Sequence, residues 1–293
     1  MSNQNRRSAI KNILAGTAAV GTVGMLSSFT QNNEVQNFEL KGNINHSVCP
    51  WCYKGVTLDE LCVFAKSIGI KGIDLLGPKD WPTVKKYGLD SPMCNGAEIN
   101  LVDGFNDKKF HSTLIKNYSE MIPQVAAAGY TNLICFSGSR RGISDETGWA
   151  NCVEGLTPLV KLAEKHKVVL VMELLNSKVN HKDYQCDRTS WGVELCKRLG
   201  SENFKLLYDI YHMQIDEGDV IHTITENHQY IAHYHTGGVP GRNEIDNTQE
   251  LYYPAIMEAI KNTGYKGYVA QEFVPKNPDK LASLKKAIQI CDV

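Results

Sequence analysis

The chain has 293 residues, of which 42% are hydrophobic and 22% charged, and its formal net charge is −1. This composition is typical of a soluble globular protein, and the body of the chain lacks an uncharged apolar run long enough to span a membrane. Non-specific nucleic-acid binding needs Lys and Arg to neutralise phosphates, so a slightly acidic chain is a poor candidate for it. We therefore expect a small-molecule substrate, no nucleic acid and no membrane insertion of the mature domain, and we leave a homo-oligomer open.

The first thirty residues differ from the rest, because the basic start NRRSAIKN precedes the Ala/Gly-rich apolar run ILAGTAAVGTVGMLSSF. This is the layout of an export signal. Arg6 and Arg7 resemble a twin-arginine signal, although Ala9-Ile10 stands where that signal usually has Phe-Leu. We predict an export signal and short linker over residues 1–36 and export to the periplasm. A frayed N-terminal helix and a cytoplasmic protein are the alternatives.

Beyond residue 40, short β-type runs alternate with amphipathic helical patterns, one of which starts with a capping box at Thr57 and Glu60. The predicted strands span residues 43–48, 71–77, 92–99, 131–138, 168–173, 204–209, 231–236 and 267–273. This alternation predicts an α/β fold, a single (β/α)₈ TIM barrel over residues 37–293. An open doubly wound sheet is the main competitor, but its glycine-rich phosphate loop is missing after the first strand.

The segment HSVCPWCYKG follows the first predicted strand and places Cys49 and Cys52 at the spacing of a redox centre. A redox centre needs its first cysteine at a helix N-terminus, but the next helical pattern starts only near Thr57. A structural zinc site would need a second such pair, which the chain lacks. We interpret the segment as a wall of the barrel mouth, with Trp51 covering a substrate.

The last four predicted strands end in polar residues, and the carboxyl ends of barrel strands are where function gathers. These residues are Glu173, Asp209, His235 and Glu272. Three carboxylates and one imidazole at one mouth do not neutralise one another, whereas a divalent cation would. An oxygen-rich set with one histidine suits Mg²⁺ or Mn²⁺, with Co²⁺ or Zn²⁺ as alternatives. Each residue alone has an ordinary explanation, such as a helix cap for Asp209.

Two further residues fit the same mouth, and a third lies deeper in the barrel. His212 follows Asp209 by three residues, one helical turn, and can face a ligand on the metal. Arg242 lies in the glycine-rich loop TGGVPGRNEID and can reach an anionic or polyhydroxy substrate, although a solvated loop cation is the alternative. His233 shares the face of His235 one layer deeper, so we expect it to be part of the interior.

The segments MELLNSK, YDIYHMQIDEGD and HYHTGGVPGRNEID resemble the xylose isomerase-like TIM barrels, and among them the hydroxypyruvate isomerase family. The resemblance runs from about residue 44 to the end of the chain. It implies one divalent metal ion held by the four strand-end residues, with Glu173 and Glu272 as catalytic acid and base. It also implies substrate contacts from His212, Arg242 and Asn176.

The implied activity is that of an isomerase, which transfers a proton through an ene-diolate on a small hydroxy-keto acid or sugar of the hydroxypyruvate or tartronate semialdehyde type. A ketose 3-epimerase and a keto-sugar lyase are alternatives on the same metal site. Hydroxypyruvate isomerases commonly have Gln where His235 stands, and epimerases carry a second Glu at the position of Val179. A non-catalytic sugar-binding barrel is a remoter alternative. So is an AP endonuclease, whose additional histidines and Asp-x-His are missing here.

Overall fold

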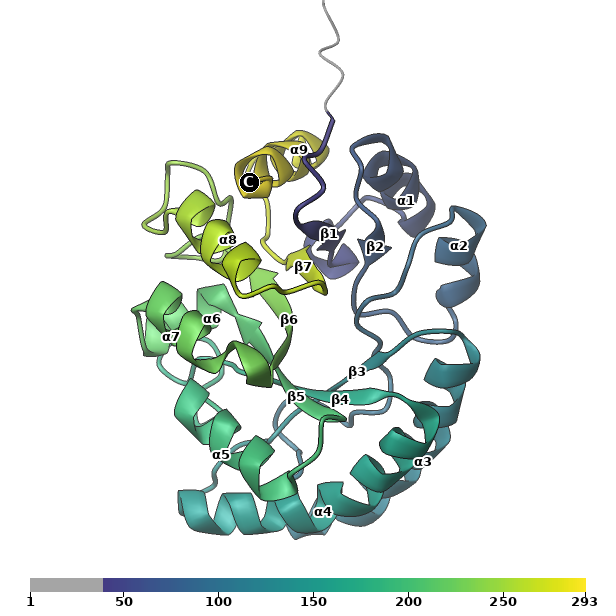
Figure 1. The fold of residues 1–293 in the computed structure, drawn as a ribbon, viewed down its shortest axis with the longest axis vertical. Helices are drawn as coiled ribbons and strands as arrows, with labels where there is room; N and C mark the ends of the chain where they lie inside the picture. The colour runs from purple at the N-terminus through teal and green to yellow at the C-terminus, as the bar shows by residue number, and fades with distance from the viewer. Residues whose placement is uncertain (1–38) are drawn as a thin grey trace, which may run out of the picture. The chain divides into compact units, whose positions relative to one another are not determined.

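Parallel strands form one curled sheet with helices arranged around its outside (Figure 1). This computed structural model describes residues 39–293, so the export signal and linker predicted over residues 1–36 lie outside the described residues. The strand order is β2-β1-β7-β6-β5-β4-β3, and all pairs are parallel. The strands are β1 (Asn45–Val48), β2 (Gly72–Ile73), β3 (Asn132–Cys135), β4 (Val169–Glu173), β5 (Phe204–Asp209), β6 (Ile231–Thr236) and β7 (Tyr268–Gln271).

Helices connect the strands and cover the outer face of the sheet (Figure 1). In the described part of the chain, none of them is both long enough and apolar enough to cross a membrane. The α-helices are α1 (Leu58–Ser67), α2 (Trp81–Lys86), α3 (His111–Ala127), α4 (Asp145–His166), α5 (Thr189–Leu199), α6 (Ile210–Asp216), α7 (Val220–Asn227), α8 (Tyr253–Asn262) and α9 (Lys280–Cys291).

The ring of strands is completed by a segment that is not itself a strand. The sequence predicted a strand over residues 92–99, and this prediction was wrong. Only Cys94 bridges to both neighbours, Leu76 on one side and Leu133 on the other. Pro92 has no N–H to donate, and Gly96 turns the chain at φ +107°, so a regular ladder cannot extend in either direction. The TIM-barrel-like fold is confirmed, with seven regular strands in the described residues and this bridging segment.

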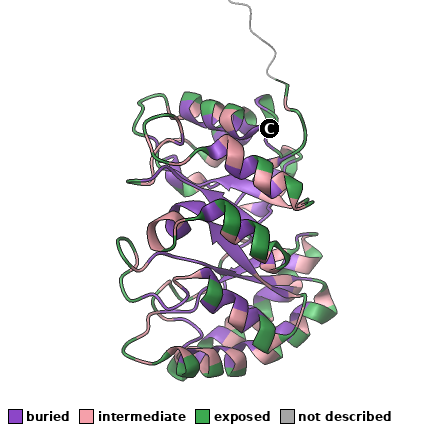
Figure 2. Ribbon diagram, turned by 60° about the vertical axis from the view of Figure 1, so that its left-hand side comes forward, coloured by how far each residue is buried: buried purple, intermediate pink, exposed green. Residues whose placement is uncertain are grey.

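Local sequence signals explain where the helices begin and end. The side chain of Thr57 accepts a hydrogen bond from the Glu60 amide while the Glu60 side chain accepts one from the Thr57 amide, so the predicted capping box of α1 is confirmed. Gly69 and Gly129 follow α1 and α3 with φ of +80° and +82°, a left-handed conformation that glycine adopts without steric cost. The strands are buried on both faces, whereas the helices expose their outer sides (Figure 2).

The register of the parallel strands brings the predicted site residues to one end of the sheet. Glu173 and Asp209 are the last residues of β4 and β5, and Glu272 directly follows β7. Asp209 pairs with His235 of β6, which in turn pairs with Ala270 of β7. Parallel strands all point their carboxyl ends to the same edge, so these side chains share one mouth.

Two loops approach each other closely beside this mouth. The amide of Phe105 donates to the Phe136 carbonyl at 3.3 Å, and the amide of Asn106 donates to the Ser137 carbonyl at 2.8 Å. Gly104 makes this approach feasible, because a Cβ there would overlap backbone atoms of residues 136–138. The contact fixes the backbone that carries Phe136 at the mouth.

Replacing Gly104 with Ala should therefore destabilise the fold by about 1–3 kcal/mol, the usual cost of overpacking a tight site. Urea unfolding followed by circular dichroism measures the change. Gly77→Ala is the matched control, since the nearest atom to its new Cβ would be the Asn95 carbonyl oxygen at 3.5 Å. Equal stability of the Gly104 variant and the native chain would show that the loops separate without cost.

Candidate functional site

Four buried side chains meet at the carboxyl end of the sheet. Each of Glu173, Asp209, His235 and Glu272 offers one ligand atom, and these atoms all lie within 4.8 Å of one another. His235 Nδ1 lies 2.8 Å from Glu272 Oε2 and 3.6 Å from Glu173 Oε1. Glu173 Oε1 has no hydrogen-bond partner among the described residues. A buried His/Asp/Glu cluster with an unpaired carboxylate oxygen is consistent with a divalent metal site.

The cluster carries more negative charge than its protein surroundings neutralise. Burial raises the pKa of Asp209 to about 7, and it also raises the pKa of Glu173. Burial opposes the charge of Glu272 as well, but Arg242 and His235 outweigh it and hold that pKa well below its usual range. Burial thus disfavours the charged form of two of the three carboxylates when no cation lies among them.

Arg242 is the cation that the chain itself supplies to the cluster. Its Nη2 donates to Asp209 Oδ2 at 2.9 Å and also to Glu272 Oε2. Its guanidinium lies 5.2 Å from the ring centroid of Trp51 and 5.5 Å from that of Tyr211. The predicted loop cation is therefore part of the site and not a solvated surface residue; its side chain is only 15% exposed.

A fourth buried carboxylate, Asp74, contacts His235 on the side away from the cluster. Asp74 Oδ2 lies 3.3 Å from His235 Nε2 and 2.5 Å from His233 Nε2. Both histidines therefore place Nε2–H toward Asp74, which leaves His235 Nδ1 facing the cluster. Burial lowers the pKa of His235, but the charge of Glu272 and the hydrogen bond with Asp74 are among the influences that together raise it well above its usual range. His233 is fully buried, and its predicted place in the interior is confirmed.

The structure places two of the predicted substrate-binding residues behind the cluster. Asn176 and His212 are fully buried, and neither lines the pocket. Asn176 Oδ1 accepts hydrogen bonds from two backbone amides, so its Nδ2 donates to His212 Nδ1 at 2.5 Å. His212 Nε2 then carries the proton and lies 3.7 Å from Asp209 Oδ2. His212 thus lies beside Asp209, to which its backbone amide donates at 3.1 Å, and a direct contact with substrate stays a prediction.

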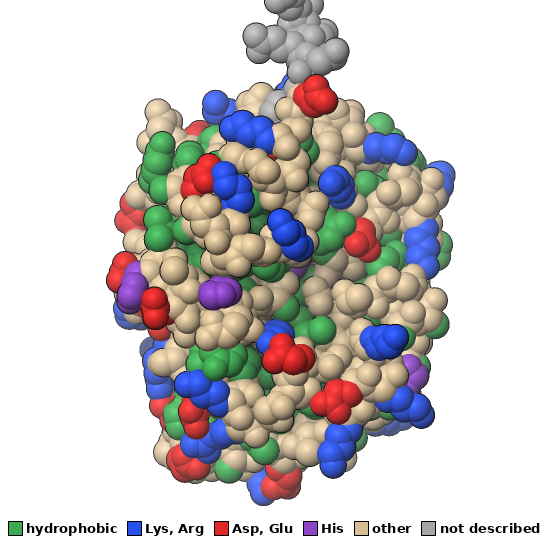
Figure 3. Space-filling view, in the orientation of Figure 1, with side chains coloured by type: hydrophobic (Ala, Val, Ile, Leu, Met, Phe, Trp, Pro, Cys, Tyr) green, Lys and Arg blue, Asp and Glu red, His purple; other side chains and the backbone are tan. Residues whose placement is uncertain are grey.

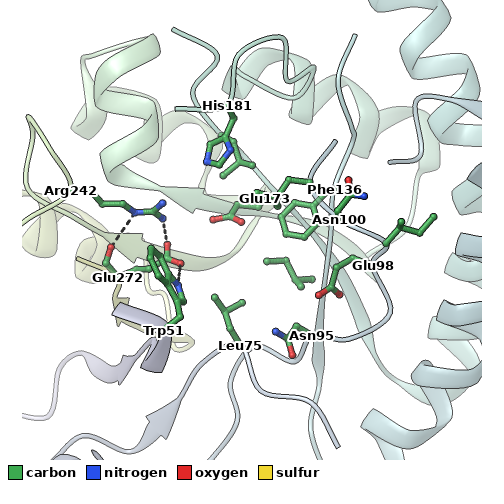
Figure 4. A pocket seen from close by; sticks show the side chains of 14 residues that line it. Trp51, Leu75, Asn95, Glu98, Asn100, Phe136, Glu173, His181, Arg242 and Glu272 are labelled. Atoms are coloured by element: carbon green, nitrogen blue, oxygen red, sulfur yellow. Dashed lines mark hydrogen bonds and ion pairs between the residues drawn. The ribbon is translucent and has the colours of Figure 1, made fainter. Parts of the chain in front are cut away.

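A pocket of about 430 Å³ opens in front of the cluster (Figure 4). Trp51, Arg242, Glu173 and Glu272 line it. Sequence reasoning missed the other polar wall residues, because they lie in loops or in the segment 92–99, where the predicted strand does not form. These are Asn95, Glu98, Asn100 and His181, and they accompany apolar residues such as Leu75, Ile134, Phe136 and Leu175.

The segment that holds the paired cysteines lines this pocket through Trp51. Cys49 and Cys52 are free thiols and buried, and burial raises the pKa of both above the usual range of a thiol. High thiol pKa values disfavour the nucleophilic thiolate that redox chemistry requires. Between them, Trp51 is 45% exposed and donates from Nε1 to Glu272 Oε1 at 2.8 Å. Trp51 therefore orients one of the carboxylates as well as covering the pocket.

Replacing Asp74 with Asn should weaken Mn²⁺ binding by about 10- to 100-fold, the typical effect of losing the partner that orients a ligating histidine. The asparagine amide would either accept a weaker hydrogen bond from His235 Nε2–H or present its own N–H to Nε2. In the second case the proton of His235 would move to Nδ1. Calorimetric titration of the metal-free protein with Mn²⁺ measures the dissociation constant. Asp90→Asn is the control, since Asp90 bonds Tyr268 Oη and contacts neither histidine. Unchanged Mn²⁺ affinity would exclude this role for Asp74.

Known proteins similar to this chain share the arrangement of strands and helices. Hydroxypyruvate isomerase from Escherichia coli is 31% identical over 234 residues, which cover 74% of this chain and 89% of that protein. 2-Oxo-tetronate isomerase from Cupriavidus necator is 33% identical over 43% of this chain and 48% of that protein, about half its length. The crystal structure of an AP endonuclease of family 2 from Brucella melitensis superposes with a TM-score of 0.73 at 22% identity, covering 82% and 96% of the two chains. The model of the xylose isomerase-like TIM barrel family matches residues 64–291, and the chain belongs to this family.

Proposed function

We propose that the protein is a divalent-metal-dependent isomerase that moves a proton on a carbon next to a carbonyl group. The observation that carries this proposal is the charge of the buried cluster. With His235 neutral and all three carboxylates ionised, as a bound cation would hold them, one guanidinium leaves two negative charges for that cation to balance. One divalent cation compensates them, and the isomerase names of the homologues agree with this chemistry.

The donor set suits Mg²⁺ or Mn²⁺ best, with Co²⁺ or Zn²⁺ as alternatives, because carboxylate oxygens outnumber the single imidazole nitrogen. Glu173, Asp209, His235 and Glu272 would hold the ion. When bound, such an ion supplies positive charge where an oxygen of the substrate becomes negative.

The chain's own residues would transfer the proton. Glu173 and Glu272 both line the pocket, so one carboxylate can take the proton from the substrate carbon while the other, protonated, can return one. Return to the adjacent carbon gives isomerisation, and return to the opposite face of the same carbon gives epimerisation. Trp51 and Arg242 fix the two oxygens of Glu272 during these steps.

The substrates proposed for this chemistry are a small hydroxy-keto acid of the hydroxypyruvate or tartronate semialdehyde type, or a keto-sugar. A ketose 3-epimerase and a keto-sugar lyase begin with the same proton abstraction. An AP endonuclease is less well supported, because likeness to a solved structure at 22% identity bears on the fold alone. Cationic and anionic side chains are also interspersed on the face seen in Figure 3, where a DNA-binding face would be predominantly basic.

Replacing Glu272 with Gln should lower turnover by about 10²- to 10⁴-fold, the usual contribution of a positioned acid–base group. Deuterium incorporation from D₂O into a hydroxy-keto substrate, followed by NMR, measures the proton transfer directly. Metal content should be measured in the same samples, and Glu250→Gln at the surface is the control. A Glu272 variant that binds metal and exchanges at the native rate would remove Glu272 from the mechanism.

Removing the metal should lower the melting temperature, because the carboxylates then lose their compensating charge. At a metal concentration 100 times Kd, binding adds about 2.7 kcal/mol, or roughly 5–10 °C in Tm for a domain of this size. The raised pKa of Asp209 means that the metal-free fold binds more protons than the unfolded chain between about pH 4 and 7. The stability of the metal-free fold therefore falls as pH rises through that window. The increase in melting temperature on adding Mn²⁺ should become larger over the same range.

Thermal scans with chelator or Mn²⁺ at pH 5 and pH 8 measure this gain. Asp209→Asn is the matched control, since an asparagine still caps helix α6 but brings no charge. A native chain that gains nothing from any of the four candidate metals, or an Asp209 variant that gains as much as the native chain, would contradict the proposed site.

A further inference from the structure

The described residues that line the pocket include more negative than positive side chains. Among the described residues that line it, Arg242 is the single Lys or Arg, whereas Glu98, Glu173 and Glu272 are acidic. Glu98 is half-buried and lies across the pocket from Glu272 and Arg242 (Figure 4). An anionic substrate would therefore meet carboxylates on both sides.

Arg242 is already engaged by the protein. Its Nη2 donates to Asp209 and Glu272, and its Nε donates to the Glu272 carbonyl oxygen at 3.3 Å. Recognition of a substrate carboxylate by arginine typically uses two parallel N–H groups, and these contacts leave only Nη1 without a partner among the described residues. One such nitrogen suffices to donate to a hydroxyl or carbonyl oxygen of a neutral molecule.

A bound metal ion does not create a surplus of positive charge. A divalent cation and Arg242 together do no more than balance the carboxylates of Glu173, Asp209 and Glu272. Glu98 adds a further negative charge. A substrate carboxylate would thus enter a partly buried site with no cation free to pair with it, which is unfavourable.

The size and lining of the pocket suit a molecule larger than a three-carbon acid. Its volume of about 430 Å³ lies within the range of roughly 300–1,000 Å³ typical of sites for drug-sized ligands, whereas a three-carbon hydroxy-keto acid has about 7 non-hydrogen atoms. Leu75 and Phe136 form an apolar surface, and Asn95 makes no side-chain hydrogen bond with the described residues. Glu98 accepts a bond from the Gly96 amide through Oε2, which leaves Oε1 for another donor. Apolar surface beside free hydrogen-bonding groups fits the C–H face and the hydroxyls of a sugar.

We propose that the substrate is an uncharged polyhydroxy ketone of more than three carbons, a keto-sugar in preference to a keto acid. This inference rests on the proposed proton transfer at the same site. Glu98 acts in it as a specificity residue, which accepts hydrogen bonds from substrate hydroxyls and repels a carboxylate.

Four probes separate charge from size: dihydroxyacetone and hydroxypyruvate with three carbons, and D-fructose and 2-keto-D-gluconate with six. Binding to the Mn²⁺-loaded and the metal-free protein is measured by calorimetry, and deuterium exchange from D₂O is measured by NMR. We expect each neutral probe to bind at least tenfold more tightly than the anion of equal length, and D-fructose to bind more tightly than dihydroxyacetone. Tighter binding of either anion, or no binding of D-fructose, would overturn the inference.

Substitution at Glu98 tests the cause of this preference. Glu98→Gln keeps the shape of the side chain and removes one charge, so the ratio of neutral to anion affinity should fall by about tenfold. Glu226→Gln, on the exposed side of α7, should leave the ratio unchanged. An unchanged ratio in the Glu98 variant would refute its role in selecting charge.

The two proposals fail in distinguishable ways. Binding of D-fructose without deuterium exchange in any probe would overturn the proposed isomerase activity and leave the preference for uncharged ligands standing. Exchange in hydroxypyruvate that matches or exceeds exchange in the neutral probes would support the activity and overturn the keto-sugar assignment.

Discussion

The burial of three carboxylates beside a single arginine is the constraint on which the rest of the site depends. The parallel strands hold Glu173, Asp209 and Glu272 close together, because their register places all three at one edge of the sheet. Burying unpaired charge is costly, and every polar neighbour responds to that cost. Arg242 contacts two of the carboxylates, and His235 lies between the two glutamates. A divalent cation would complete the neutralisation, which ties the stability of the fold to the chemistry of its mouth.

The regular parts of the fold were predictable because their sequence signals are local. The strands over residues 204–209 and 231–236 were predicted with the bounds that the structure gives. The segment 92–99 has the same apolar character, but its pairing depends on which backbone groups remain available after Pro92 and Gly96. Periodicity reports which residues are buried and does not report which amides find a partner, so the closure of the ring could not be read from the sequence.

The candidate site was predictable where its residues end regular strands and not where they lie in loops. The sequence predicted that the three acidic side chains and His235 lie close together, because the end of each strand has a defined position in a barrel. The path of a loop has no such rule, so the wall formed by Glu98 and His181 was missed. Asn176 and His212 lie close to the cluster but behind it. Two backbone amides donate to the side-chain oxygen of Asn176 and hold it there. A place behind Asp209 could not be distinguished from a substrate contact by spacing alone.

The pocket draws its two sides from different halves of the chain. The charged side comes from the ends of β4 to β7, whereas the facing side comes from residues 75–136, which include the sparsely paired segment that closes the ring. Most of the facing wall is thereby encoded apart from the groups that would transfer the proton, and the exceptions are Trp51 and Asp74. Substitutions in residues 95–101 can remodel what enters the pocket while Glu173 and Glu272 keep their positions. In a barrel of this kind, substitutions can change the substrate without changing the reaction.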